Sequence, residues 1–185
     1  MTQKIIGLSG YARTGKDTVA NILSYSFDFK RIAFADSIRQ ALYTLNPLIA
    51  HDGGVTFLQC LLEDNDWDDL KDNKEIRRLL QRLGTEVGRD MFDENIWVHT
   101  AFKKIQASAS QNIVITDVRF LNEAMALRDM GAEIWRINRP GVCAINNHKS
   151  ETDLDNFNFD VVIENDCTLE SLTHDVMNHI AWKVS

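Results

Sequence analysis

The sequence predicts an α/β fold in which a parallel sheet carries helices on both faces. Two observations support this prediction. Short apolar runs alternate along the chain with segments in which apolar residues recur at helical spacing. A glycine-rich turn also separates the first apolar run from the first helical segment, as in an open parallel sheet. Because crossover helices must return each strand to the same edge, such alternation covers the sheet on both sides.

The predicted strands are short and mostly apolar, as expected for strands buried on both faces. They are "KIIGLS" (4–9), "RIAFAD" (31–36), "NIVITDV" (112–118), "EIWRIN" (133–138) and "DVVIEN" (160–165). Helical spacing predicts helices after the glycine-rich turn, from Ile38 to a stop at Asn46 and Pro47, over 121–130 with a stop at Gly131, and over about 169–183.

Two segments depart from the alternation inside what we expect to be one domain, 1–185. Residues 46–111 are predicted to form a helical insertion, in which an acidic loop precedes the amphipathic helix "EIRRLLQRLGTEVG" (75–88). Residues 138–158 are polar and irregular and are interpreted as a short mobile lid, which includes His148. Both follow the carboxyl ends of strands, where ligand-facing loops of such sheets lie.

Composition narrows the classes of function. A net charge of −7 argues against a nucleic-acid groove, where clustered cations provide most of the affinity. Cys60, Cys143 and Cys167 are far apart and are interpreted as reduced thiols. No apolar run approaches the roughly 20 residues of a membrane span, and the start of the chain lacks a signal-peptide pattern. We therefore expect a cytoplasmic protein without a membrane partner.

The turn "GYARTGKDT" (10–18) is nearly a phosphate-binding loop. Gly10, Gly15 and Lys16 fit the pattern G-x-x-x-x-G-K, in which backbone N–H groups and the lysine surround phosphates. The pattern continues with Ser or Thr, but here Asp17 intervenes and the hydroxyl comes one place later, at Thr18. The spacing, the strand before it and the helix after it predict nucleotide binding.

Asp17 is an acid placed beside a predicted polyphosphate site. At about 5 Å and an effective dielectric constant of 20, it would repel each phosphate charge by roughly 3 kcal/mol. The helix dipole offsets only about 0.3–1 kcal/mol. A magnesium ion between the carboxylate and the phosphates would resolve the conflict. The alternative is that Asp17 only caps the helix.

Acids and arginines follow two of the other predicted strands. Asp36 and Arg39 begin the helix after "RIAFAD", where Arg39 could bind an acceptor phosphate and Asp36 could be the helix N-cap. Asp117 and Arg119 end the most apolar strand, where the acid suits magnesium and the arginine can span two phosphates. A solvated Arg39 and purely structural roles for Asp117 and Arg119 are the alternatives.

The acidic stretch "DNDWDDLKDNKE" (64–75) imitates a calcium-binding loop. Asp69 stands where that loop needs glycine, and Lys71 stands where an apolar residue belongs. We interpret the stretch as a solvated acidic turn, with Glu75 closing a capping box on Asp72.

With these residues placed, the chain resembles the deoxynucleoside monophosphate kinases of the phage type over nearly its whole length. The resemblance rests on "GYARTGKDT", "RIAFADSIRQALYTLNP", "LLQRLGTEVGRDMFDENIWV", "VITDVRFLNEA", "INRPG", "HKSETDLD" and "VIEND". A wider similarity is to adenylate kinase and its relatives. The resemblance implies a three-layer P-loop NTPase fold with a five-stranded parallel sheet, ATP as phosphoryl donor with Mg²⁺, and a deoxynucleoside monophosphate as acceptor.

It also implies roles for residues. Catalytic residues would be Lys16, Asp117 and Arg119; ATP would be bound by Gly10, Arg13, Thr14, Gly15, Lys16, Asp17, Thr18 and Arg139; the acceptor by Asp36, Arg39, Gln81, Thr85, Glu86, Arg89 and Arg119; and the metal by Asp17, Thr18 and Asp117. Residues 138–158 hold Arg139 as their only arginine, whereas the lids of the wider group carry several, so Arg136 is an alternative lid arginine. A kinase of another small phosphorylated metabolite and a non-catalytic nucleotide-binding regulator stay open, as does a homodimer.

Overall fold

The computed structural model describes residues 3–110, 112–143 and 152–181. The chain divides into two compact units. Unit 1 comprises residues 1–33 and 102–185, and unit 2 comprises residues 34–101. The division falls inside helix α5 (Ile96–Gln106), and each unit is described by itself.

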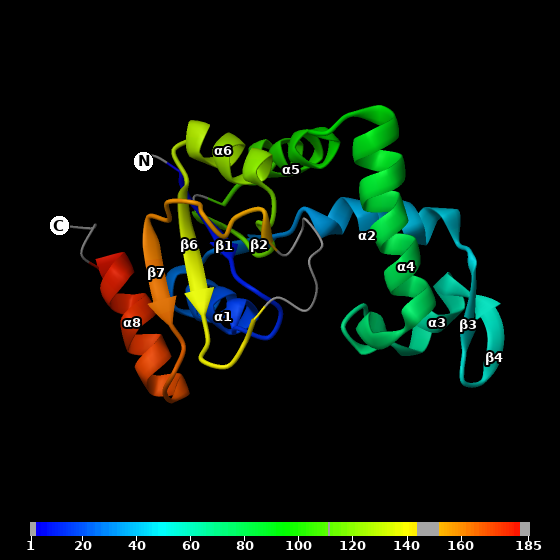
Figure 1. The fold of residues 1–185 in the computed structure, drawn as a ribbon, viewed down its shortest axis with the longest axis horizontal. Helices are drawn as coiled ribbons and strands as arrows, with labels where there is room; N and C mark the ends of the chain where they lie inside the picture. Colours follow the sequence, from blue (N-terminus) through cyan, green and yellow to red (C-terminus); the bar gives the residue numbers. More distant parts are fainter. Residues whose placement is uncertain (1–2, 111, 144–151, 182–185) are drawn as a thin grey trace. The chain divides into compact units, whose positions relative to one another are not determined.

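Unit 1 contains a five-stranded sheet in which every neighbouring pair of strands is parallel (Figure 1). Its strands are β1 (Lys4–Ser9), β2 (Lys30–Ile32), β5 (Asn112–Ile115), β6 (Glu133–Asn138) and β7 (Val161–Glu164), in the order β2-β5-β1-β6-β7. The predicted parallel α/β fold is confirmed. Because β1 is the middle strand, the turn that follows it lies at the centre of the sheet's carboxyl edge.

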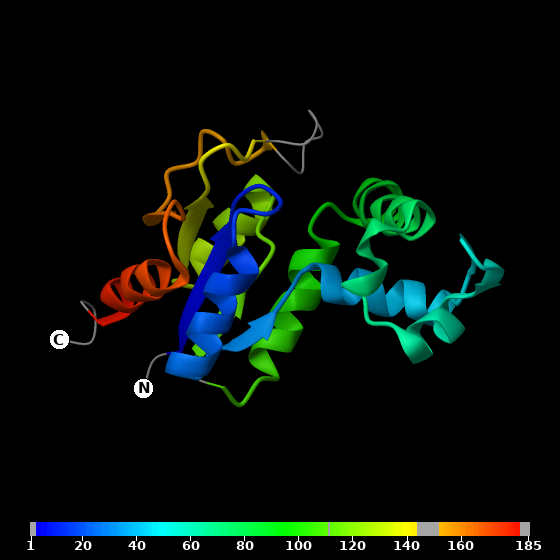
Figure 2. The ribbon, with the colours of Figure 1, turned by 90° about the horizontal axis from the view of Figure 1, so that it is seen from below.

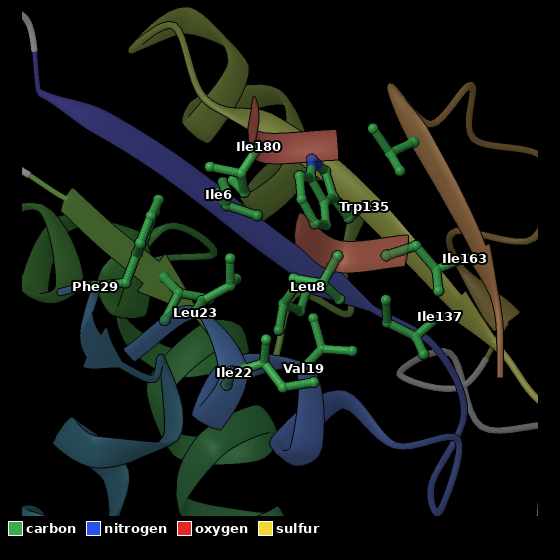
Figure 3. Packing of buried hydrophobic residues seen from close by; sticks show 14 of the residues in the cluster. Ile6, Leu8, Val19, Ile22, Leu23, Phe29, Trp135, Ile137, Ile163 and Ile180 are labelled. Atoms are coloured by element: carbon green, nitrogen blue, oxygen red, sulfur yellow. The ribbon is translucent and has the colours of Figure 1, made fainter. Parts of the chain in front are cut away.

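Helices cover both faces of this sheet. Helix α1 (Lys16–Phe27) runs beside β1 in Figure 2, and it packs with α8 (Leu169–Ala181) on one face. There Ile6 and Leu8 of β1, Leu23 of α1 and Trp135 of β6 are fully buried in one cluster (Figure 3). Helix α6 (Leu121–Asp129) packs on the other face, where a side chain at Gly7 would meet Leu127 at 3.2 Å.

Unit 2 is mainly helical, as expected for the insertion, but an unexpected hairpin follows its first helix. Its elements are α2 (Ala35–Leu45), β3 (Leu48–His51), β4 (Gly54–Phe57), α3 (Leu58–Asp64), the 3₁₀-helix η1 (Asp69–Asp72), α4 (Lys74–Arg82) and the π-helix η2 (Leu83–Phe92). Strands β3 and β4 pair antiparallel around Asp52 and Gly53. Leu42, Ile49, Leu58 and Ile76 form the buried core of the unit.

Several predicted boundaries were wrong. The second strand ends at Ile32 and the third at Ile115, so both are shorter than predicted. Helix α2 begins at Ala35 with Phe34 in the N-cap position, so Asp36 lies in its first turn and is not the N-cap. Asn73, and not Asp72, caps α4: its side chain accepts hydrogen bonds from the N–H groups of Glu75 and Ile76.

Within the described residues, no helix is long and apolar enough to cross a membrane. Of the predicted lid, residues 144–151, with His148, lie outside the part of the chain that the structure describes.

Candidate active site

The turn between β1 and α1 has a backbone that only certain residues tolerate. Gly10 has a φ of 144° and Gly15 a φ of 102°, and Arg13 between them also has a positive φ, 67°. At Gly10 a Cβ atom would lie 2.3 Å from the carbonyl oxygen of Ile137 on β6. Glycine is therefore required at position 10 both by conformation and by the close approach of β6.

Lys16 is folded back onto this turn. Its Nζ donates to the carbonyl oxygens of Gly10 at 2.8 Å and Tyr11 at 2.7 Å. Thr14 is buried and its Oγ1 donates to the same Tyr11 carbonyl at 3.0 Å. The ammonium group is thus held at the mouth of the turn, where a phosphate could replace the carbonyl partners.

Asn165, which directly follows β7, supports the turn and is not among the site residues predicted from the sequence. Its Nδ2 donates to the carbonyl oxygen of Thr14 at 2.9 Å, and a Cβ on Gly15 would lie 2.5 Å from that nitrogen. One feature of the sequence could have indicated Asn165. It is the last residue of the predicted strand 160–165, at the edge of the sheet where the turn lies.

Asp17 does not cap α1, so the capping alternative was wrong. Gly15 occupies the N-cap position, and Asp17 is the second residue of the helix. Its carboxylate accepts a 2.8 Å hydrogen bond from Arg31 on β2, in an ion pair whose side chains are 83% and 38% exposed. Thr18 follows, half-buried, on the same helix. In this structure the cation paired with Asp17 is therefore Arg31, from the edge strand β2.

The residues after β5 lie beside β1, the strand that leads into this turn. The N–H of Val118 donates to the carbonyl oxygen of Leu8 on β1 at 3.0 Å, which ties this segment to the strand that leads into the turn. Asp117 is half-buried and Arg119 is exposed. Glu123 is 2% exposed and accepts hydrogen bonds from the N–H groups of Arg119 at 2.8 Å and Phe120 at 3.1 Å. This buried carboxylate fixes the backbone that carries Arg119.

Of the two candidate lid arginines, Arg136 contacts the glycine-rich turn. Its guanidinium lies 4.5 Å from the centre of the Tyr11 ring and 3.6 Å from Asp155, and its side chain is 11% exposed. Tyr11 donates a 2.7 Å hydrogen bond to Asp155. That bond, with a smaller effect of burial, raises the pKa of the Tyr11 phenol above its usual value. Arg139 follows β6 and is exposed.

Unit 2 holds the predicted acceptor residues other than Arg119, which belongs to unit 1. Asp36 and Arg39 line a hollow of about 250 Å³ together with Gln40, Tyr43 and Trp67. The Arg39 guanidinium lies 5.9 Å from the centre of the Trp67 ring. The structure therefore brings a side chain of the acidic stretch to the arginine expected to bind the acceptor phosphate.

Gln81, Thr85, Glu86 and Arg89 lie on α4 and η2 and are not among the residues that line this hollow. Glu86 accepts a 3.0 Å hydrogen bond from Arg82, and Arg89 donates to the carbonyl of Glu94 at 3.0 Å.

The π-helical turns of η2 pack against an indole. The Trp97 Nε1 donates to the carbonyl of Gly84 at 2.7 Å, and a Cβ on Gly88 would meet the Trp97 ring at 2.4 Å. Gly88 therefore serves this packing, whereas a Cβ on Gly84 would instead meet Ile38 at 3.0 Å. Turns of π-helix often accompany functional sites.

The oxygen donors near the turn suit magnesium better than a softer metal. Within the described residues, no group of three or more His, Cys, Asp or Glu side chains could hold a metal by itself. Mg²⁺ usually binds through one or two carboxylates, with phosphates and waters completing its shell. Asp117 and the Thr18 hydroxyl are donors of that kind.

Together, the sheet order and the glycine-rich turn after the central strand define a P-loop nucleotide-binding protein. The structure of TT1252 from Thermus thermophilus is similar in fold, with a TM-score of 0.50 and 15% identity over 99% of both chains.

The chain belongs to the deoxynucleotide monophosphate kinase family, whose sequence pattern matches residues 57–176. A protein of Acanthamoeba polyphaga mimivirus is 30% identical in an alignment 186 positions long, which covers 94% of this chain and 94% of the viral protein. The deoxynucleotide monophosphate kinase of Escherichia phage RB69 is 32% identical over 136 residues. That match covers 69% of this chain and 55% of the phage protein, so the two differ in length.

Proposed function

We propose that this protein transfers the γ-phosphoryl group of ATP to a deoxynucleoside 5′-monophosphate and releases ADP and the deoxynucleoside diphosphate. The observation that carries the proposal is the turn between β1 and α1, with Lys16 at its mouth, in a chain of the deoxynucleotide monophosphate kinase family. The substrates are small molecules, so neither nucleic acid nor a membrane is needed as a partner. We expect the reaction to take place in the cytoplasm, that of the host if the chain is phage-encoded.

The donor nucleotide would be held by unit 1. Backbone N–H groups of the turn and of the start of α1 would donate to phosphate oxygens, and α1 would add the positive end of its dipole. The proposed ATP ligands are Gly10, Arg13, Thr14, Gly15, Lys16, Asp17, Thr18 and Arg139. Displaced from its two carbonyl partners, the Lys16 ammonium would pair with phosphate oxygens instead.

Catalysis would consist mainly of positioning and charge neutralisation. Arg119 would stabilise the charge on the phosphoryl group as it moves, and Glu123 would hold the Arg119 backbone in place. Asp17, Thr18 and Asp117 are the residues proposed to hold Mg²⁺, directly or through water. The ion would neutralise phosphate charge during the transfer.

The acceptor would be held by unit 2. Arg39 would bind the acceptor phosphate, and Asp36, half-buried one turn earlier on α2, would lie in the same hollow. Gln81, Thr85, Glu86 and Arg89 would contribute from α4 and η2, with Glu86 sharing its charge with Arg82. Arg119 would reach the acceptor phosphate as well.

A coupled assay of ADP release tests the proposal. The wild-type protein would be supplied with Mg²⁺-ATP and, one at a time, the deoxynucleoside and ribonucleoside monophosphates, dephospho-coenzyme A and phosphomevalonate. We expect turnover with at least one deoxynucleoside monophosphate, and Lys16→Ala should abolish it while Lys103→Ala, an exposed lysine on α5, should not. Turnover confined to another metabolite, or tight ATP binding without any turnover, would overturn the proposal.

A further inference from the structure

The hollow in unit 2 combines a cation with two aromatic rings. Four of its residues, Asp36, Arg39, Gln40 and Tyr43, come from α2 at the spacing that places side chains on one helix face. Trp67 completes the lining from the segment between α3 and η1. The hollow has a volume of about 250 Å³, and small-molecule sites begin at roughly 300 Å³, so it is close to the size of a small ligand site.

Trp67 is held in place by the core of unit 2. Its half-buried side chain packs against the cluster of Leu42, Ile49, Leu58 and Ile76, and the same residue lines the hollow. Asp66, the residue before it, accepts hydrogen bonds from the N–H groups of Asp68 and Asp69 at 2.7 and 2.8 Å, which fixes the turn that carries the ring. The indole of Trp67 is therefore already in position before any ligand binds.

The lining matches the two ends of a nucleotide. Arg39 offers a guanidinium to a phosphate, and 5.9 Å away Trp67 offers an aromatic ring to a base. A sugar phosphate without a base would use only the first of these groups. A base alone would use only the Trp67 ring. Gln40 adds an amide that can donate hydrogen bonds to, and accept them from, the edge of the base.

We propose that Trp67 is the base-stacking residue of the acceptor site, so that a monophosphate binds with its phosphate on Arg39 and its base against the indole. This inference rests on the proposed function, which it extends to the recognition of the base. Every base has a π face, so stacking favours bases in general and discriminates weakly between them. The protein should therefore accept more than one nucleobase. Differences in affinity between the bases would come from hydrogen bonds between the Gln40 amide and the edge of the base.

The test uses two variants, Trp67→Ala and Trp67→Phe, with Tyr25→Ala as a matched control because Tyr25 is an exposed aromatic of unit 1. Each protein is first checked by thermal melting. The KM values for the monophosphate and for ATP are then measured, along with the inhibition constant of 2-deoxyribose 5-phosphate, which carries the phosphate and sugar but no base.

Removal of the ring should raise the KM for the monophosphate about 5- to 150-fold, the loss that removal of one stacked aromatic causes. The KM for ATP and the inhibition constant of 2-deoxyribose 5-phosphate should stay within twofold of wild type. Trp67→Phe should recover most of the loss. Unchanged binding of the monophosphate by Trp67→Ala would overturn the inference. So would a parallel weakening of 2-deoxyribose 5-phosphate, since Trp67 would then act by positioning Arg39.

Calorimetric titration of the monophosphate into the same proteins keeps this result separate from the proposed function. If the wild-type protein binds the monophosphate but turns over none, the proposed reaction fails. The comparison of Trp67→Ala with wild type then still decides the role of the indole. If the wild-type protein does not bind it at all, both proposals fail.

Discussion

Asp17 carries the prediction on which the metal assignment depends. In the structure its carboxylate is paired with Arg31 at 2.8 Å, but the side chains are 83% and 38% exposed. An ion pair so exposed is worth about 0–1 kcal/mol. A phosphate charge about 5 Å from the carboxylate would be repelled by roughly 3 kcal/mol. Arg31 would therefore offset only part of that repulsion, and we propose that a divalent ion offsets the rest.

Replacing Asp17 with alanine separates the metal from the nucleotide. If the carboxylate holds Mg²⁺ directly or through water, Asp17→Ala should raise the Mg²⁺ concentration for half-maximal activity about 10- to 100-fold, the usual cost of losing a group that supports a metal. Metal-free ATP should bind at least as tightly as to wild type, because a repulsive charge is gone. Asp17→Ser should recover part of the activity, because its hydroxyl is the ligand that the P-loop pattern places there.

The assay titrates activity and ATP affinity against Mg²⁺ for wild type, the two Asp17 variants and Arg31→Gln. The Arg31 variant removes the arginine partner and leaves the carboxylate, so its Mg²⁺ midpoint should stay the same or fall. An unshifted midpoint in Asp17→Ala would falsify the metal role. A rise of the Mg²⁺ midpoint by the same factor in Arg31→Gln would also refute the metal role, because loss of the Asp17–Arg31 ion pair would then explain the effect.

Three further substitutions probe the site. Arg39→Ala should raise the KM for the monophosphate about 10- to 150-fold, from charge-assisted hydrogen bonds worth roughly 1.5–3 kcal/mol, and change the KM for ATP far less; equal effects would reject the acceptor role. Arg119→Ala should lower kcat about 10²- to 10³-fold, and a kcat within a few-fold of wild type would remove this arginine from the chemistry. Gly10→Ala should abolish ATP binding in calorimetry, because its Cβ would lie 2.3 Å from the Ile137 carbonyl oxygen at a φ of 144°. Its control is Gly54→Ala, which has a φ of 125° but no atom within 4 Å; ATP binding retained by Gly10→Ala would contradict the reasoning.

The parts of the fold that could be predicted are those with a local signal. Five apolar runs and the helical spacing between them predicted the parallel sheet, and "GYARTGKDT" predicted the turn, because its glycines meet a conformational need within nine residues. The hairpin also had a local signal, Asp52-Gly53 between apolar residues, a two-residue turn typical of hairpins. It was missed because the whole segment was interpreted as helical.

The remaining differences come from contacts that only the folded chain makes. Asp36 is a good N-cap by residue type, but α2 begins at Ala35 and places it inside the first turn. Asn165 and Trp67 contact residues far away in the sequence, Thr14 and Arg39, and no spacing within either segment indicates the partner. Asp17 was predicted to bind a metal or to cap the helix. Its ion pair with Arg31 could not be predicted, because Arg31 lies 14 residues later and comes beside Asp17 only when β2 joins the edge of the sheet.

The contact between Asn165 and the P-loop has a consequence for synthesis of the chain. The hydrogen bond from Asn165 to Thr14 spans 151 residues, and β1 must wait for β5 and β6 before it has a neighbour on either side. At about 5–20 residues per second, a ribosome needs roughly 8–30 s to make that stretch. The first strand to leave the ribosome is thus among the last to gain both of its neighbours in the sheet. Until then the apolar residues of β1 lack their sheet partners, and long-range pairing of this kind is slow, so we expect the emerging chain to need protection from aggregation.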